Sequence, residues 1–376
     1  MMKIAVNTRF LIKGKLEGIG RFTLEIVQRL VKNHPEDTFY FIFDRPYDKE
    51  FIFGSNVVPA VVSPPARHPI LWKIWFDWSV KRYLDKIKPD IFFSPDGYLP
   101  LKTNVPCVPV IHDLAFEHYP KDVPKSVLKF YRKYFPKYTH KAKHIIAVSE
   151  YTKRDIVEQY EVPVNKITVA YNAVNQIYKP STEEEKELTR KKYTQGKPYF
   201  LFVGAIHPRK NVVNVLKSFD EFKKQYHTDH KLIIVGRKGW KYEDAFQTYE
   251  QMDYKSEVIF TGHLEIEELR LLYGAADCLL YISYFEGFGI PIIEALACGC
   301  PVITSNVSSM PEIVGKAGLL VDPMDVQNIV RMMQKVSLQT GKKEELLAYA
   351  PQQLSLFDWD KSAEKIYKVL KESAAR

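Results

Sequence analysis

Residues 277–305 read DCLLYISYFEGFGIPIIEALACGCPVITS, and this stretch decides the fold. Its apolar beginning, Asp277–Tyr284, predicts a buried strand, and Gly299–Ser305 predicts a turn followed by another strand. Between them a glycine-rich turn leads into a helix with Pro291 in its first turn, where no backbone N–H is needed. Such strand, loop, helix and strand units form parallel sheets, which bind ligands at the carboxyl ends of their strands.

Two carboxylates accompany this turn. Glu286 precedes the glycines and Glu294 lies one turn inside the predicted helix. Carboxylates accept hydrogen bonds from the hydroxyls of a sugar or a ribose, and the start of a helix favours phosphate. The combination predicts a site for a nucleotide-sugar. The alternative is that Glu286 is a solvated loop residue and that the spacing arises by chance.

Strands alternate with helical patterns along the whole chain, which predicts an α/β protein with doubly wound parallel sheets. The first half is expected to contain a helix at Arg21–Lys32 and strands at Lys3–Asn7, Phe39–Phe43, Ile91–Ser94, Val108–Ile111, His144–Val148 and Lys166–Val169. Strands of the second half are expected at Tyr199–Val203, Lys231–Val235, Val258–Phe260, Cys278–Ile282, Pro301–Thr304 and Gly318–Val321. We therefore expect two Rossmann-like domains, 1–175 and 198–356, separated by a cleft, with a polar linker at 176–197 and a terminal helix within 357–376.

Adjacent cations follow the first strand of the second half. Arg209 and Lys210 stand between that strand and the next predicted helix, a position that suits a diphosphate. The alternative is that Arg209 and Lys210 are an ordinary surface pair at the start of a helix. In the first half, His112 and Asp113 follow an apolar strand and are expected at the carboxyl edge of its sheet.

Further motifs accompany the stretch at 277–305 along the chain. They are GIGRF (18–22), HDL (112–114), VSEYTKRDI (148–156), VGAIHPRKN (203–211), SNVSSMPE (305–312), AGLLVDP (317–323) and FDWDKSA (357–363). With residues 279–325 they closely resemble the retaining glycosyltransferases of family 4. The resemblance covers nearly the whole chain and implies the GT-B fold, in which the terminal helix, here about Asp360–Glu372, crosses back to the first domain.

The resemblance also implies roles for individual residues. Glu286 would hold sugar hydroxyls with help from the amides of Gly287, Phe288, Gly289 and Ile290, while Glu294 would bind the ribose. Arg209 and Lys210 would hold the diphosphate, and His112 would lie beside the transferred sugar. Asp113 would orient the His112 ring or bind the acceptor. The backbone at Gly18 and Gly20 would approach the donor phosphates. The turn Gly262-His263-Leu264 would lie beside the base. Many relatives carry arginine where this chain has Ala205, so the cation pair would act alone.

The predicted activity is transfer of a hexose, of mannose or glucose type, from a GDP- or UDP-linked donor to a glycan or lipid-linked hydroxyl. The family implies retention of configuration, with the leaving phosphate accepting the proton, and an origin in bacterial surface polysaccharide synthesis. We expect no cofactor beyond the donor substrate and no metal. The single Asp-x-Asp triplet, Asp358-Trp359-Asp360, falls at a helix start, where Asp360 is expected to be the N-cap.

Charge is concentrated in the first half. Residues 1–175 carry 27 Lys and Arg against 18 Asp and Glu, whereas residues 176–376 carry 27 of each. Lysines four residues apart, among them Lys125, Lys129 and Lys133, alternate with aromatic residues within 119–143. They form either a solvated helix face or a dock for anionic lipid or a lipid-linked acceptor. Nucleic acid is not expected as a partner, because no binding motif accompanies the charge. The chain is expected in the cytoplasm, at the inner face of the membrane.

Rival functions have their own signals. Gly18-x-Gly20 followed by Asp44 at the next strand end imitates the fingerprint of a nicotinamide-dependent oxidoreductase. The glycines, however, follow a long loop and the third glycine is absent. A sugar-nucleotide 2-epimerase of the same fold would lack an acceptor site. A non-catalytic subunit is disfavoured because the glutamates and the cation pair are all present.

Overall fold

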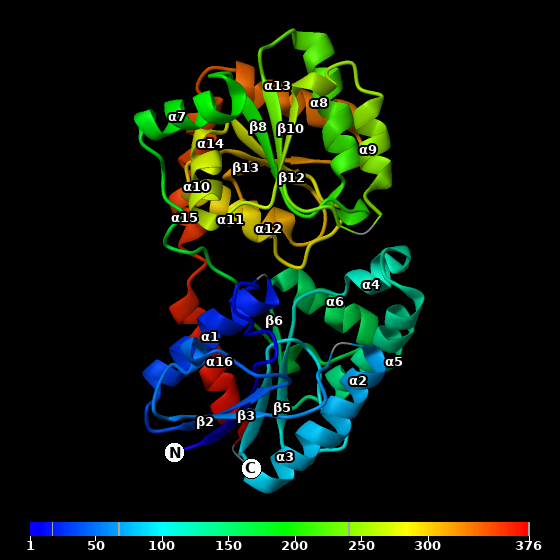
Figure 1. Ribbon diagram of the computed structural model, residues 1–376, viewed down its shortest axis with the longest axis vertical. Coiled ribbons are helices and arrows are strands. Elements are labelled where there is room, and N and C mark those ends of the chain that lie inside the picture. The colour runs from blue at the N-terminus through cyan, green and yellow to red at the C-terminus, as the bar shows by residue number, and fades with distance from the viewer. Residues whose placement is uncertain (17, 67, 240, 375–376) are drawn as a thin grey trace. The chain divides into compact units, whose positions relative to one another are not determined.

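The computed structural model describes residues 1–376 except 17, 67, 240, 375 and 376. The chain divides into two compact units, which Figure 1 shows as separate sheets with their own helices. The first unit comprises Met1–Asn172 and the C-terminal segment that begins at Asp358, and the second comprises Ala173–Phe357. Among the described residues, no helix is both long enough and apolar enough to cross a bilayer.

The first unit contains a seven-stranded sheet in the order β3-β2-β1-β4-β5-β6-β7, and its neighbouring strands pair in parallel. The strands are β1 (Lys3–Asn7), β2 (Thr38–Phe43), β3 (Val57–Val61), β4 (Ile91–Ser94), β5 (Cys107–Ile111), β6 (Ile145–Ala147) and β7 (Ile167–Val169). The helices are α1 (Ile19–Asn33), α2 (Pro69–Ile74), the π-helix η2 (Trp75–Val80), α3 (Lys81–Ile87), α4 (Ala115–His118), α5 (Lys125–Lys141), α6 (Glu150–Tyr160) and α16 (Trp359–Ala374). Short 3₁₀ turns lie at η1 (Lys49–Phe51), η3 (Pro120–Asp122) and η4 (Val164–Lys166).

The second unit repeats this plan with six parallel strands in the order β10-β9-β8-β11-β12-β13. The strands are β8 (Tyr199–Val203), β9 (Lys231–Val235), β10 (Val258–Gly262), β11 (Cys278–Tyr281), β12 (Val302–Ser305) and β13 (Gly318–Val321). The α-helices are α7 (Glu183–Thr194), α8 (Val212–Tyr226), α9 (Glu243–Glu250), α10 (Ile266–Ala275), α11 (Ile290–Ala297), α12 (Met310–Val314), α13 (Val326–Leu338), α14 (Lys342–Leu347) and α15 (Ala350–Leu354). The 3₁₀ turns are η5 (Pro208–Lys210) and η6 (Lys255–Glu257).

In both sheets the strand order reverses at the first strand of the unit. β1 lies between β2 and β4, and β8 lies between β9 and β11. This is the strand order of dinucleotide-binding domains, and ligands bind such sheets where the order reverses, outside the carboxyl ends of the strands. The fold therefore directs attention to the residues that follow β1 and β4, and to those that follow β8 and β11.

The predicted strands are all present, with ends that differ by at most one or two residues, and one strand was not predicted. That strand, β3, contains Pro59, and a proline lacks the N–H that a central strand donates to its neighbour. The structure places β3 at the edge of its sheet, where it pairs only with β2. An edge strand can accommodate a proline, so Pro59 is compatible with a strand at this position.

The segment predicted as a linker, 176–197, belongs to the second unit. Its charged helix, α7, begins with a capping box between Thr182 and Glu185. Glu185 also pairs with Arg270 of α10 at 2.5 Å, and Arg190 donates to the carbonyl of Ala275 at 3.0 Å. These contacts hold α7 against the second sheet's helices, so the change of unit lies before it, at Asn172–Ala173.

The terminal helix α16 packs against α1 of the first unit. Its N-cap differs from the expected one: the Asp358 carboxylate accepts from the backbone N–H of Asp360 and Lys361 at 2.7 and 3.1 Å. Asp360 instead pairs with Arg29 of α1 at 2.6 Å. Tyr367 adds a hydrogen bond of 2.7 Å to Asp37. The last two residues of the predicted segment, 375–376, lie outside the described residues.

Candidate active site

The carboxyl ends of β8 and β9 approach each other through glycine. Gly204 follows β8 and Gly236 follows β9, and both have a positive φ of about 150°. A Cβ on Gly236 would lie 1.9 Å from the Gly204 carbonyl oxygen, so a side chain there would force the two backbones apart. The close approach leaves the loops after β8 and β9 side by side at the edge where a ligand is expected.

Arg209 and Lys210 meet Glu286 at this edge. The cations lie in η5, after β8, and Glu286 lies in the loop after β11. Lys210 Nζ is 2.6 Å from Glu286 Oε1, and Arg209 Nη1 is 3.3 Å from Oε2. The structure thus brings together three residues that the sequence places 76 and 77 positions apart.

Neighbouring groups hold the two cations in place. Arg209 Nη1 donates to the Phe285 carbonyl at 2.7 Å, and Lys210 Nζ donates to the Tyr281 hydroxyl at 2.9 Å. The backbone N–H of Tyr284 donates to the Arg209 carbonyl at 2.9 Å, which ties the two loops together. The cations are therefore fixed at the point where the strand order of the second unit reverses.

The charge state of Glu286 follows from these contacts. Burial would raise its pKa, but the charges of Lys210 and Arg209 outweigh burial and lower the pKa to about 2. Glu286 is therefore an ionised hydrogen-bond acceptor at neutral pH and not a proton donor. His207, one residue before η5, has its pKa lowered to about 4 by burial and by the same two cations, so it is neutral.

The glycine turn after Glu286 is held by two serines. Ser309 Oγ lies 2.8 Å from the Glu286 carbonyl and 2.9 Å from the Phe288 carbonyl. The Glu286 N–H donates to Ser308 Oγ at 3.1 Å. Gly289, with φ of 100°, precedes α11, and Pro291 lies in the first turn of that helix as predicted. Ser308 and Ser309 belong to one of the matching motifs, but their role in holding this turn is visible only in the structure.

Glu294 and the predicted base-binding turn, Gly262-His263-Leu264, lie on the same unit. Glu294, half-buried in α11, accepts from the Tyr273 hydroxyl at 3.0 Å. The turn Gly262-His263-Leu264 closes β10, and the Gly236 N–H donates to the Gly262 carbonyl at 2.8 Å. His263 is exposed and Leu264 is half-buried. The second unit therefore carries every residue predicted for the nucleotide and the diphosphate except Gly18 and Gly20.

These two glycines belong to the first unit, where Gly18 precedes α1 with φ of 43°. A Cβ on Gly20 would lie 2.9 Å from the Phe10 carbonyl oxygen. The loop before α1 therefore requires a glycine at position 20 for its own packing.

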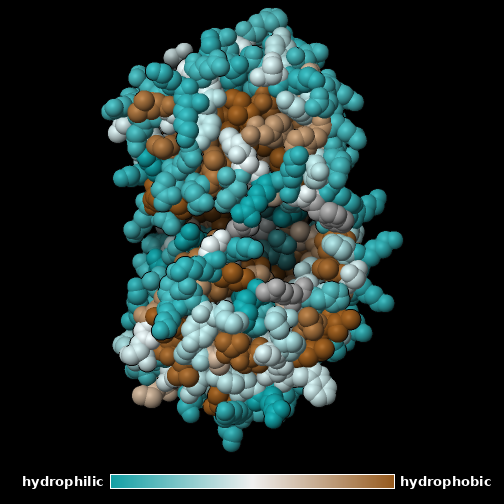
Figure 2. Space-filling view, viewed as in Figure 1, coloured by the Kyte–Doolittle hydropathy of each residue, from teal (hydrophilic) through white to brown (hydrophobic). Residues whose placement is uncertain are grey.

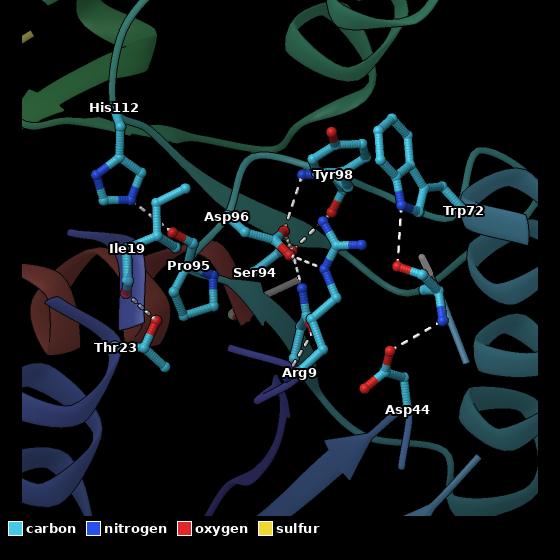
Figure 3. Close-up of polar contacts among 12 residues, drawn as sticks. Arg9, Ile19, Thr23, Asp44, Trp72, Ser94, Pro95, Asp96, Tyr98 and His112 are labelled. Atoms are coloured by element: carbon cyan, nitrogen blue, oxygen red, sulfur yellow. Dashed lines mark hydrogen bonds and ion pairs between the residues drawn. The ribbon is translucent and has the colours of Figure 1, made fainter. Parts of the chain in front are cut away.

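His112 follows β5 in the first unit and is half-buried. Its Nε2 lies 2.7 Å from the Pro95 carbonyl (Figure 3), and Phe22 packs edge-on against the ring with centroids 5.2 Å apart. Burial lowers the pKa of His112, so the ring is neutral at pH 7. Since a carbonyl oxygen only accepts, Nε2 carries the proton and Nδ1 is a hydrogen-bond acceptor. Asp113 accepts from the Ala115 N–H at 3.0 Å and so supports the start of α4.

A buried ion pair near His112 was not predicted. Arg9, which is 5% exposed, follows β1, and its Nε lies 2.5 Å from Asp96 Oδ2, after β4 (Figure 3). Ser94 Oγ and the Tyr98 N–H donate to the other Asp96 oxygen at 3.0 and 3.2 Å. Burial would lower the Arg9 pKa, but the Asp96 charge raises it, so Arg9 stays charged. Neither Arg9 nor Asp96 belongs to a motif that predicts the pair; the pairing of β1 with β4 brings them together.

The remaining predicted residues lie apart from this edge. Lys125, Lys129 and Lys133 are exposed on α5. In the described parts of the chain, no three His, Cys, Asp or Glu side chains gather as they would around a metal ion. Asp44, which the oxidoreductase alternative would use for a ribose, is fully engaged at its two oxygens by Arg45 at 2.6 and 2.7 Å and by the Ala66 N–H at 2.9 Å.

Comparison with known proteins agrees with this architecture. Residues 16–176 match the family described as Glycosyltransferase Family 4, and residues 183–353 match the one described as Glycosyl transferases group 1. The O-antigen chain mannosyltransferase B of Escherichia coli is 28% identical over 93% of this chain and 94% of its own length. The O-antigen chain mannosyltransferase RfbU of Salmonella typhimurium is 30% identical over 74% of this chain and 75% of its own.

Solved structures show the same fold. Anabaena Alr3699/HepE, in complex with UDP-glucose, superposes with a TM-score of 0.76 over 99% of this chain and 100% of that chain, at 18% sequence identity. The two sheets and the family matches together define a glycosyltransferase of the GT-B fold. The chain belongs to the family 4 glycosyltransferases, as the motifs predicted, and the oxidoreductase alternative is therefore wrong.

Proposed function

We propose that this glycosyltransferase moves a hexose from a nucleotide-diphosphate sugar to a glycan or lipid-linked hydroxyl during surface polysaccharide synthesis. Within the hexoses, we propose mannose as the transferred sugar. The cluster of Arg209, Lys210 and Glu286 is the single observation that carries the proposal. The names of the O-antigen mannosyltransferases among its relatives support the choice of sugar and of pathway class. The cluster itself supports a nucleotide-diphosphate donor.

The diphosphate is assigned to Arg209 and Lys210. Both cations contact the Glu286 carboxylate, and their side chains are 21% and 14% exposed, so they are accessible to a ligand. An arriving diphosphate adds charge-assisted hydrogen bonds, each contributing about 1.5–3 kcal/mol. As the bond to the sugar breaks, the leaving phosphate gains charge and these contacts strengthen, which lowers the barrier.

Glu286 is assigned to the transferred sugar. Because its pKa is lowered to about 2, the carboxylate accepts hydrogen bonds from sugar hydroxyls throughout the physiological range. Its negative charge also favours the positive character that develops on the anomeric carbon. Two cations draw electron density from the same carboxylate, so Glu286 is a poor nucleophile. We therefore assign the retaining route in which the leaving phosphate accepts the proton of the acceptor hydroxyl.

Glu294 and His112 complete the assignment. Glu294, whose Oε2 is oriented by the Tyr273 hydroxyl, is proposed to accept from the ribose hydroxyls. His112 presents Nδ1 as an acceptor, which suits a hydroxyl of the sugar and not a phosphate. No protein group is required as the base, and we propose that the donor is bound without a cofactor. Gly262, His263 and Leu264 are assigned to the base by their position after β10.

The test is to incubate the purified chain with GDP-mannose or UDP-glucose and a lipid-linked glycan acceptor. We expect a product heavier by one hexose in mass spectrometry, with the anomeric configuration of the donor in NMR. Inversion would overturn the retaining assignment. Conversion of the donor to its 2-epimer without an acceptor would favour the epimerase instead, and no reaction with any nucleotide-hexose would overturn the proposal as a whole.

A further inference from the structure

An exposed apolar stripe runs along one side of the first unit. Ile70, Ile74 and Trp78, which we call the apolar stripe, are 65%, 39% and 64% exposed. They follow one another at four-residue intervals on the continuous helical segment α2–η2, so they share one face of it. Isolated exposed apolar residues are common, whereas a row of three large ones marks a surface that contacts something else.

The helical segment that carries the stripe also has a face that packs on the core. The same helical segment buries Trp75, Phe76 and Val80 completely or nearly so. Trp72 is half-buried and packs against Phe130 of α5. The segment is thus anchored to the first unit by its inner face, and its outer face is apolar as well. Apolar surface gathers over α2 in Figure 2.

Lysines lie beside the stripe and on the neighbouring helix α5. Lys102 Nζ lies 5.0 Å from the centre of the Trp78 ring. Lys73 of α2, together with Lys133 and Lys137 of α5, lies 5.2–5.8 Å from the Tyr134 ring. All four lysines are exposed, and α2 packs against α5. The basic stripe predicted on α5 therefore belongs to the helix that packs against the one that begins the apolar stripe.

In the described residues, acidic side chains of this region pair with Lys73 and Lys81 but with none of Lys102, Lys133 and Lys137. Asp77, the acidic residue of the η2 segment, is 5% exposed, and it accepts from Lys73 and from the Leu101 N–H. On α3, Asp85 pairs with Lys81. The lysines that face solvent on α5 thus keep their positive charge available to an anionic partner.

We propose that this surface docks the enzyme on an anionic bilayer, with Ile70, Ile74 and Trp78 entering the headgroup region and Lys102, Lys133 and Lys137 contacting lipid phosphates. A tryptophan has an apolar ring and a polar N–H, which suits the interface between water and hydrocarbon. Each lysine near an anionic surface strengthens binding about fivefold. The charge favours a membrane over a second copy of this basic chain, because two copies would repel each other.

This inference goes beyond the transfer reaction and does not rest on it. The donor site lies on the second unit, whereas the docking surface lies entirely on the first. Docking would bring the enzyme to lipid-linked acceptors without changing its chemistry. Removing the surface is therefore expected to reduce activity on a lipid-linked acceptor in vesicles and to spare activity on a short water-soluble glycan.

The experiment measures sedimentation of the full chain with vesicles of phosphatidylcholine that contain about one third phosphatidylglycerol, at low and high salt. The test variants are Ile74→Ser with Trp78→Ser, and the triple change Lys102→Gln, Lys133→Gln and Lys137→Gln. The matched controls change an exposed apolar residue elsewhere, Leu188→Ser, and three exposed lysines elsewhere, Lys335→Gln, Lys365→Gln and Lys371→Gln. Circular dichroism melts verify that each variant folds.

We expect the apolar double variant to bind at least about tenfold more weakly and the lysine variant about 100-fold more weakly at low salt, with both controls unchanged. Brominated acyl chains should quench tryptophan emission in the wild type, and Trp78→Phe should lose most of that quenching while still binding. The proposal is overturned if the wild type does not bind anionic vesicles, or if the test variants bind as well as the controls. It is also overturned if ultracentrifugation shows a dimer that only the stripe variant loses.

Discussion

Each unit has a cation after its first strand that pairs with an anion after the strand beside it. The two clusters differ in composition and exposure. In the first unit, Arg9 follows β1 and Asp96 follows β4; in the second, Arg209 and Lys210 follow β8 and Glu286 follows β11. The first is one cation with one anion, 5% and 2% exposed. The second has two cations for one anion, and its cations are partly exposed.

This difference separates a scaffold from a binding site. A balanced and buried pair has no charge to offer a ligand and is costly to disturb. An accessible cluster with two cations can exchange part of its internal pairing for contacts with a phosphate. We therefore expect substitutions in the first pair to affect folding and substitutions in the second cluster to affect donor binding and turnover.

The largest effect is expected for Asp96→Ala, which leaves the Arg9 charge buried without its partner. Breaking a buried pair in this way costs about 3–5 kcal/mol. The urea midpoint of the first unit, followed by circular dichroism, should fall sharply, while calorimetric binding of GDP or UDP below that transition stays unchanged. Asp85→Ala, which breaks the exposed Lys81 pair, is the control and should cost less than about 1 kcal/mol. If both variants had the same urea midpoint, the Arg9–Asp96 pair would not be needed for the stability of the first unit.

The next effect is expected for Glu286→Gln, which keeps the shape of the side chain and removes its charge. Loss of one preorganised electrostatic contact lowers kcat by about 10²- to 10³-fold. Binding of the nucleotide diphosphate should be retained, since the change frees both cations. Turnover is measured with labelled donor and affinity by calorimetry, with exposed Glu265→Gln as the control. Wild-type turnover in this variant would remove Glu286 from the mechanism.

A smaller effect is expected for His112→Gln. The loss of one neutral acceptor should lower kcat/KM about tenfold. Because burial lowers the pKa of His112, the wild-type rate should fall only when the pH drops below the ordinary histidine value of 6.5. The variant should lack that acid limb in its pH–rate profile. An acid limb that persists unchanged in the variant would assign the titration to another group.

The smallest effect is expected in how the stability contributed by Glu286 depends on pH. The Glu286 pKa is lowered from 4.5 to about 2, so the stabilisation it provides is complete above pH 4.5 and is lost as the pH falls toward 2. The difference in melting temperature between wild type and Glu286→Gln should therefore narrow between pH 5 and pH 3. A shift of about 2–4 °C accompanies each kcal/mol. A difference that is constant across this range would contradict the lowered pKa.

The sequence predicted the fold well because its strands are continuous apolar runs between clear turn signals. It failed at β3, where Pro59 is tolerated only because the strand lies at an edge, and an edge position is not visible in one sequence. The cap of α16 was misplaced by two residues, because Asp358 and Asp360 both fit the cap preference and only tertiary pairing with Arg29 separates them.

The candidate site was predictable where a motif is local. Arg209 and Lys210 are neighbours, and Glu286 stands beside its glycines, so each was identified separately, but not the ion pairs that join them. Arg9 and Asp96 are 87 residues apart and belong to no motif that marks charge, so their pairing depends on the register of β1 with β4. The exposure of Ile70 and Trp78 likewise requires knowing which helix face the core covers.

The central claim, that Arg209 and Lys210 receive the donor's diphosphate, is tested most directly by calorimetry with a nucleoside diphosphate and the matching monophosphate. The wild type is expected to prefer GDP over GMP, or UDP over UMP, by at least about tenfold. Arg209→Ala with Lys210→Ala should lose that preference and keep its affinity for the monophosphate, while exposed Lys217→Ala behaves as the wild type. A double variant that still prefers the diphosphate as strongly as the wild type would contradict the account.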